Sequence, residues 1–61
     1  MPIVNIKIVE GRTVEQKRAL AKKVTEALVE TIGARAEAVT ISIEDTKREN
    51  IANGGVLNID K

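Results

Sequence analysis

Apolar and polar residues alternate with a period of two along residues 2–9, which is the pattern of a β-strand. Val4, Ile6 and Ile8 fall on one face, and the opposite face is mixed in character. Gly11 then interrupts the pattern and offers a turn that other residues enter only at a cost. The sequence therefore predicts a first strand over residues 2–9 with one fully apolar face.

Helical spacing begins directly after this turn. Thr13 stands three residues before Gln16, as in a capping box, and Gly33 suits the left-handed position that closes a helix. The pattern predicts one long helix between Thr13 and Gly33. Its expected apolar face comprises Leu20, Ala21, Val24, Ala27, Leu28 and Ile32. The charged residues expected to point elsewhere are Lys17, Arg18, Lys22, Lys23, Glu26 and Glu30.

The second half of the chain returns to strand patterns. Residues 39–44 alternate strictly and predict a half-buried strand, followed by a polar loop over residues 45–50. Asn53-Gly54-Gly55 is a tight-turn signal between the apolar pairs Ile51-Ala52 and Val56-Leu57, which predicts a short C-terminal hairpin. Strand, helix and strand make a right-handed crossover with parallel strands.

These elements predict an α+β fold, a β-α-β unit with a C-terminal hairpin, in a single domain over residues 1–61. One helix cannot cover both faces of a two-stranded sheet. The chain also has only 61 residues, with no Phe, Tyr, Trp or Cys, and a domain of this size buries only about 60% of its unfolded surface. We therefore expect subunits to share a sheet and a core in an oligomer.

The amino-acid composition argues against several classes of function. Without Cys or His, zinc, haem and iron-sulfur sites lack credible ligands. The net charge of +1 gives no general attraction to nucleic acid or an anionic membrane. There is neither an apolar run of membrane-spanning length nor a secretory signal pattern, so we expect a soluble cytoplasmic protein.

The first residues carry the most distinctive chemistry. Removal of Met1 would leave Pro2 with a secondary amine, whereas other backbone nitrogens are amides. An ordinary α-amino group has a pKa of roughly 7.7 to 8.0, which an apolar pocket beside a cation lowers. Such a base suits proton abstraction next to a carbonyl. The alternative is an ordinary proline at the start of a strand, and with Met1 attached the nitrogen is a tertiary amide.

Other charged residues have simpler interpretations. Arg12, between the turn glycine and the helix, can bind a carboxylate bidentately or be a solvated surface residue. Glu44 and Asp45 are adjacent at a strand end, so their side chains should diverge and be solvated. The basic residues of the helix lack aromatic neighbours for base stacking and predict an exposed face.

Over essentially its whole length the chain resembles the 4-oxalocrotonate tautomerase family. The matching motifs are Pro2-Ile3, Ile6-Lys7-Ile8-Val9-Glu10-Gly11-Arg12-Thr13, Glu15-Gln16-Lys17, Val24-Thr25-Glu26-Ala27 and Gly54-Gly55. The resemblance implies a chain that begins at the proline and assembles into a homohexamer, a trimer of dimers. It further implies cofactor-independent conversion of 2-hydroxydienoates or related enols of keto acids, and a place in aromatic hydrocarbon catabolism.

The resemblance also implies residue roles. Pro2 would move the proton between the enol oxygen and carbon, and Arg12 would hold the distal carboxylate in a site commonly shared between subunits. The best-known members carry a second arginine where this chain has Thr40, and an aromatic residue where it has Ile51. Ile51 keeps the site apolar. Thr40, however, cannot replace the arginine that stabilises charge on the carbonyl oxygen, and loss of one such oxyanion donor costs roughly 3 kcal/mol.

Two apolar residues at the ends of the first strand, Ile3 and Val9, are the expected pocket wall. Lys47 or Arg48, in the loop after the second strand, can supply a replacement cation only if the loop turns back toward the site. Because Thr40 replaces the second arginine, we expect weak activity on dicarboxylate enols or a preference for substrates with one carboxylate.

Three alternatives stay open at this point. The first is a hydratase or dehalogenase of the same superfamily, with Glu44 positioning water. The second is a catalytically impaired oligomeric scaffold, or one paired with a different subunit that supplies the missing cation. The third is a ribbon-helix-helix DNA-binding dimer. The strand pattern of residues 39–44 argues against it, because that fold needs a second helix there.

Overall fold

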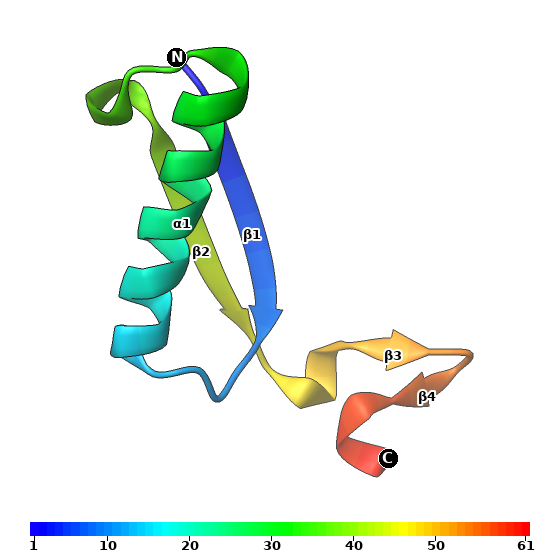
Figure 1. The fold of residues 1–61 in the computed structure, drawn as a ribbon. Coiled ribbons are helices and arrows are strands. Elements are labelled where there is room, and N and C mark those ends of the chain that lie inside the picture. The colour runs from blue at the N-terminus through cyan, green and yellow to red at the C-terminus, as the bar shows by residue number, and fades with distance from the viewer.

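The computed structural model describes all residues 1–61 and shows the α+β architecture that the sequence predicts (Figure 1). The helices and strands in chain order are β1 (Ile3–Val9), α1 (Val14–Ile32), β2 (Thr40–Thr46), β3 (Ala52–Asn53) and β4 (Val56–Leu57). Three short 3-10 turns occupy Ala36–Ala38, Arg48–Asn50 and Asn58–Asp60. None of the helices combines the length and apolar character needed to cross a membrane.

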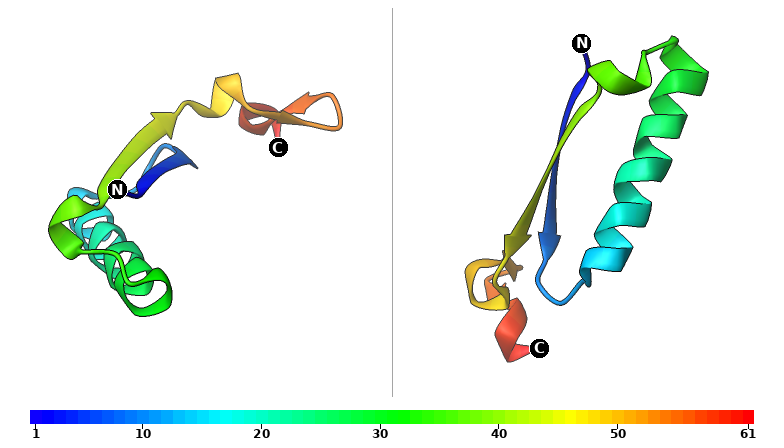
Figure 2. Two further views of the ribbon diagram at one scale, coloured as in Figure 1. Left: turned by 90° about the horizontal axis from the view of Figure 1, so that it is seen from above. Right: turned by 90° about the vertical axis from the view of Figure 1, so that its left-hand side faces the viewer.

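Strands β1 and β2 form a parallel pair in which Ile3 lies opposite Thr40 and Val9 opposite Thr46. Helix α1 runs beside one face of this pair, as the right-hand view of Figure 2 shows. The half-buried sheet residues on that face are Val4, Ile6, Ile8, Ile41 and Ile43. The opposite face of the sheet has no covering element, so the predicted β-α-β unit is confirmed with one face open.

The second strand differs from its predicted bounds. It covers Thr40–Thr46 rather than residues 39–44, so the prediction of a loop at Asp45 and Thr46 is wrong. Both residues pair with β1, because Ile8 and Val9 extend the partner strand and present backbone groups that β2 satisfies. Polar side chains there do not end the strand, since pairing rather than hydropathy sets its length.

The ends of α1 confirm the predicted caps. Thr13 Oγ1 accepts a hydrogen bond from the Gln16 N–H at 3.1 Å, and Gln16 Oε1 accepts one from the Thr13 N–H at 2.9 Å. Gly33 ends the helix with φ of 69°, in the left-handed region. Because both ends are capped by local hydrogen bonds, the position of α1 follows directly from the sequence.

The predicted apolar face of α1 is correct only in part. Leu20, Ala21, Val24 and Leu28 are half-buried, but Ala27 and Ile32 are exposed. These two residues have no element of this chain above them, because the sheet covers only the inner stripe of the helix. The prediction that Lys17 and Glu26 point outward with the other charges is wrong: both are half-buried, and Lys17 pairs with β2.

The C-terminal hairpin matches its prediction. The loop between β3 and β4 is Gly54-Gly55, with φ values of 57° and 83° that favour glycine at both positions. The Asn58 N–H donates to the Ile51 carbonyl at 2.7 Å and closes the hairpin on itself. Glu10 accepts a hydrogen bond from the backbone N–H of Arg48 at 3.2 Å, which ties this segment to the end of β1.

No residue of the single chain is fully buried. The radius of gyration is 14.5 Å, whereas a compact domain of this length has a value of about 10.5 Å. Figures 1 and 2 show the reason, since the hairpin projects away from the β-α-β unit. The large apolar residues that stay exposed are Met1, Ile3, Val14, Val29, Ile32, Val56, Leu57 and Ile59. A chain of this shape has no closed core of its own.

Candidate functional site

The candidate base lies at the start of the sheet. The Pro2 carbonyl accepts a hydrogen bond from the Thr40 N–H at 3.0 Å, and Ile3 lies opposite Thr40 in the parallel register. Pro2 is half-buried, while the side chain of Ile3 is 65% exposed. The structure therefore brings three of the candidate residues together at this end, which we call the proline end. Met1 precedes Pro2 and is 89% exposed.

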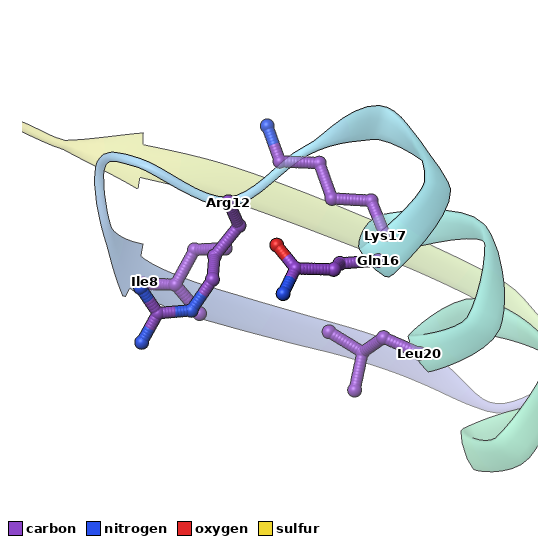
Figure 3. Close-up of a pocket in the computed structure, with 5 residues that line it drawn as sticks. All are labelled: Ile8, Arg12, Gln16, Lys17 and Leu20. Atoms are coloured by element: carbon purple, nitrogen blue, oxygen red, sulfur yellow. The ribbon is translucent and has the colours of Figure 1, made fainter.

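The candidate carboxylate clamp lies at the opposite end of β1. Gly11 turns the chain with φ of 116°, and Arg12 follows it before α1 begins. A cavity of about 230 Å³ opens there (Figure 3). Its lining residues are Ile8, Arg12, Gln16, Lys17 and Leu20. We call this cavity the Arg12 pocket.

Only one of the two cations in the Arg12 pocket is unpaired. Lys17 Nζ lies 2.7 Å from Asp45 Oδ2, and the Lys17 side chain is 27% exposed. Arg12 takes part in none of the ion pairs of the chain. In Figure 3 the amino group of Lys17 points away from the Arg12 guanidinium. Arg12 is therefore the cation left to bind an anion at this pocket.

Sequence reasoning missed Lys17 because it treated the charged residues of the helix as one outward face. The signal that could have found it is the register of β2. Asp45 lies opposite Ile8, and alternation along the strand puts Asp45 on the side covered by α1. A carboxylate on that side lies within reach of a cation from the first turns of the helix, and Lys17 pairs with it.

The remaining pocket candidates lie at the end of β1 that leads to Arg12, but neither lines the Arg12 pocket. Val9 ends β1 opposite Thr46, and half-buried Ile51 follows the 3-10 turn that Glu10 anchors. We call this end the arginine end. The seven residues of β1 span about 20 Å at roughly 3.3 Å per residue. Within one chain, Pro2 and Arg12 are therefore too far apart to contact the same small molecule.

Neither proposed substitute for the missing second arginine lines the Arg12 pocket. Lys47 Nζ lies 4.0 Å from Glu49 Oε1. The Arg48 guanidinium donates to the Asn58 carbonyl at 3.4 Å, which stabilises the C-terminal segment. Both cations are engaged locally in this chain, beyond the end of β2 and away from Thr40.

The adjacent carboxylates diverge as expected. Glu44 lies 3.9 Å from Lys7 on the open face of the sheet, whereas Asp45 pairs with Lys17 on the helix side. Because the two side chains lie on opposite faces of the sheet, they do not share a proton. Glu44 is exposed, and its location beside Lys7 gives no support for a water-positioning role next to Pro2.

Comparison with known proteins agrees with this arrangement of elements. A family model described as tautomerase enzyme matches residues 2–60. The chain belongs to the tautomerase family. The ribbon-helix-helix alternative is thereby wrong, and β2 shows the physical reason, because it is a strand where that fold needs a second helix.

Relatives at high identity agree with the family assignment. The chain is 49% identical over 61 residues to a probable tautomerase of Bacillus cereus, covering 100% of both chains. It is 49% identical over 55 residues to a 2-hydroxymuconate tautomerase of Bacillus subtilis, covering 90% of this chain and 89% of that one. These relatives support tautomerase activity, which makes the protein an isomerase.

Solved tautomerase structures share the whole fold. One homologue of 4-oxalocrotonate tautomerase superposes with a TM-score of 0.94 at 45% identity, covering 98% of both chains. A 4-oxalocrotonate tautomerase from Chloroflexus aurantiacus, with a TM-score of 0.93 at 25% identity, covers 98% of this chain and 97% of that one. The latter is a heterohexamer. Assembly of small subunits thus occurs among tautomerases with this fold.

Proposed function

We propose that this tautomerase interconverts enol and keto forms of 2-hydroxydienoate or enol-pyruvate carboxylic acids without a cofactor. Pro2, freed by removal of Met1, is the general base and then the general acid. Arg12 binds the substrate carboxylate. The observation that carries the proposal is the Arg12 pocket, in which an unpaired guanidinium stands beside the apolar side chains of Ile8 and Leu20.

The proton transfer in this proposal is balanced within one substrate molecule. The Pro2 amine accepts the proton of the enol hydroxyl, and the O–H electron pair forms the new carbonyl bond. The electrons of the carbon-carbon double bonds shift along the chain, and the prolinium returns the proton to carbon. No oxidant, metal or second substrate is required. A base with a pKa near the working pH serves both half-steps.

The distance between the two ends of β1 supports a site that is shared between subunits. Pro2 of one subunit and Arg12 of another meet in a homo-oligomer, for which we propose the hexameric trimer of dimers. Support comes from the absence of any buried residue in the single chain and from the exposed apolar side chains at both ends of the sheet. Ile3, Val9 and Ile51 complete the apolar wall, and Thr40 borders the carbonyl oxygen.

Subunit complementation tests this proposal. One variant carries an extra glycine before Pro2, which blocks the nitrogen, and the other carries Arg12→Ala. Each variant alone should be strongly impaired on phenylenolpyruvate and on 2-hydroxymuconate. After the two are denatured together and refolded, mixed oligomers contain sites built from an intact Pro2 and an intact Arg12, so activity should return.

The matched control refolds the Arg12→Ala variant with itself at the same total concentration, and its activity should stay low. Two results would contradict the proposal. If both single variants convert substrate at the unmodified rate, neither residue takes part in the reaction. If the mixture contains both subunits by native mass spectrometry yet regains no activity, the site is not shared between subunits.

A further inference from the structure

Besides its two cations, the Arg12 pocket contains one uncharged polar side chain, that of Gln16. Gln16 Oε1 accepts the hydrogen bond from the Thr13 N–H at 2.9 Å, so the oxygen of the amide faces the helix cap. The amide nitrogen therefore lies on the other side. Figure 3 shows this nitrogen facing the space between the Arg12 guanidinium and Leu20.

The Gln16 amide nitrogen has no hydrogen-bond acceptor within the chain. Arg12 likewise has no carboxylate partner. Two donors thus border the same cavity, while Lys17 is neutralised by Asp45. A carboxylate has two oxygens and accepts several hydrogen bonds, so it matches this pair of donors.

We propose that Gln16 is a specificity-determining residue, which donates its amide N–H to the same substrate carboxylate that Arg12 binds. This inference rests on the proposed function, since it takes Arg12 as the carboxylate clamp. The capping box holds the amide in place before substrate arrives, which reduces the entropy lost on binding. Ile8 and Leu20 contact the carbons next to the carboxylate, so the site takes an acid with an apolar or unsaturated chain.

The residue type at position 16 fits this role. A capping box accepts either Glu or Gln at this position, because only a side-chain oxygen is needed. Glutamate would place a carboxylate beside Arg12 and compete with the substrate for the guanidinium. Glutamine provides the same capping oxygen and leaves Arg12 unpaired.

Four variants of the full chain, measured on phenylenolpyruvate, test this inference, and one of them, Arg12→Ala, reports on the carboxylate clamp itself. Gln16→Glu keeps the capping oxygen but loses the donor, and Gln16→Met loses both. Glu15→Gln is the matched control, because Glu15 is exposed in the same helical turn and pairs with Arg18 rather than facing the pocket. Thermal melting of each variant reports the condition of the helix cap.

We expect KM to rise about tenfold in Gln16→Glu and severalfold in Gln16→Met, as the loss of a hydrogen bond to a charged group predicts. The value of kcat should change less than about twofold, because the bond is made equally in ground and transition states. Glu15→Gln should keep the KM of the unmodified protein. Gln16→Glu should melt like the unmodified protein, and Gln16→Met at a lower temperature.

Any other pattern of KM values overturns the inference. If KM is unchanged in both Gln16 variants while Arg12→Ala raises it, Gln16 does not contact the carboxylate and the proposed function is unaffected. If KM rises only in Gln16→Met, the cause is the lost cap. If it rises only in Gln16→Glu, the cause is the added charge. If Arg12→Ala itself leaves KM unchanged, the carboxylate-clamp role fails along with this inference.

Discussion

The two ends of β1 differ in chemistry and in local support. At the proline end, Pro2 and Thr40 meet through one backbone hydrogen bond, and the nearby Arg35 in the connection before β2 pairs with Glu37. At the arginine end, an unpaired guanidinium lines a cavity beside a capped helix and an ion pair. One end thus holds the candidate base, and the other holds the unpaired cation.

This difference shows that a single chain without a closed core cannot bring its candidate base and its candidate carboxylate clamp together. A seven-residue strand is rigid and keeps the two halves about 20 Å apart. Only a second subunit can bring an arginine end next to a proline end. Assembly would then create the site and bury the exposed apolar residues in the same step, which couples stability to activity.

The largest expected effect on kcat comes from blocking the Pro2 nitrogen. Retention of Met1, or one added glycine, converts the Pro2 amine to an amide, and kcat should fall about 10³-fold, as loss of a general acid-base predicts. Intact-mass measurement identifies the N-terminal state of each preparation. The control is size-exclusion chromatography with light scattering, which should give the same oligomer. Equal kcat in preparations with and without Met1 would exclude Pro2 as the base.

The next largest expected effect comes from removing the Arg12 guanidinium. Arg12→Ala should raise KM for phenylenolpyruvate about 10- to 100-fold, because a hydrogen-bonded charge is lost. Arg12→Lys should be intermediate, since a lysine keeps the charge but not the two-pronged geometry. A lysine variant as impaired as the alanine variant would show that charge alone contributes little. Initial-rate kinetics across substrate concentrations distinguish these cases.

A gain of activity is expected when a cation is added at the proline end. Thr40→Arg adds a cation beside Pro2, and kcat/KM on 2-hydroxymuconate should rise about tenfold, because a donor is restored to the developing oxyanion. Thr40 is exposed at the start of β2 in the single chain. Ser42→Arg, two residues along the same face, is the matched control and should have no such effect. A gain in both variants would indicate a general charge effect.

The smallest expected effect concerns the ion pair of the Arg12 pocket. Lys17→Met should lower the free energy of unfolding by less than about 1 kcal/mol, since Lys17 and Asp45 are partly exposed. Activity should stay within about twofold, because Asp45 already neutralises Lys17. Chemical denaturation and kinetics on phenylenolpyruvate measure the two quantities. A tenfold rise in KM would mean that Lys17, together with Arg12, binds the carboxylate.

Much of the local structure follows from the sequence. The capping box at Thr13, the left-handed Gly33 and the Gly54-Gly55 loop each satisfy backbone groups through nearby residues. Their positions therefore do not depend on distant contacts. The family motif also identifies the candidate base and clamp, because it consists of particular residues at particular places in the chain.

The tertiary structure decided the features that depend on partners distant in sequence. Pairing with Ile8 and Val9 extended β2 through Asp45 and Thr46, which hydropathy alone assigns to a loop. The same register put Asp45 beneath α1, drew Lys17 inward and left Arg12 unpaired. Alternation along the chain specifies which residues share a face. The choice of ion-pair partners depends on the strand register and on the packing of the helix. Both are set only when the elements pack together in three dimensions.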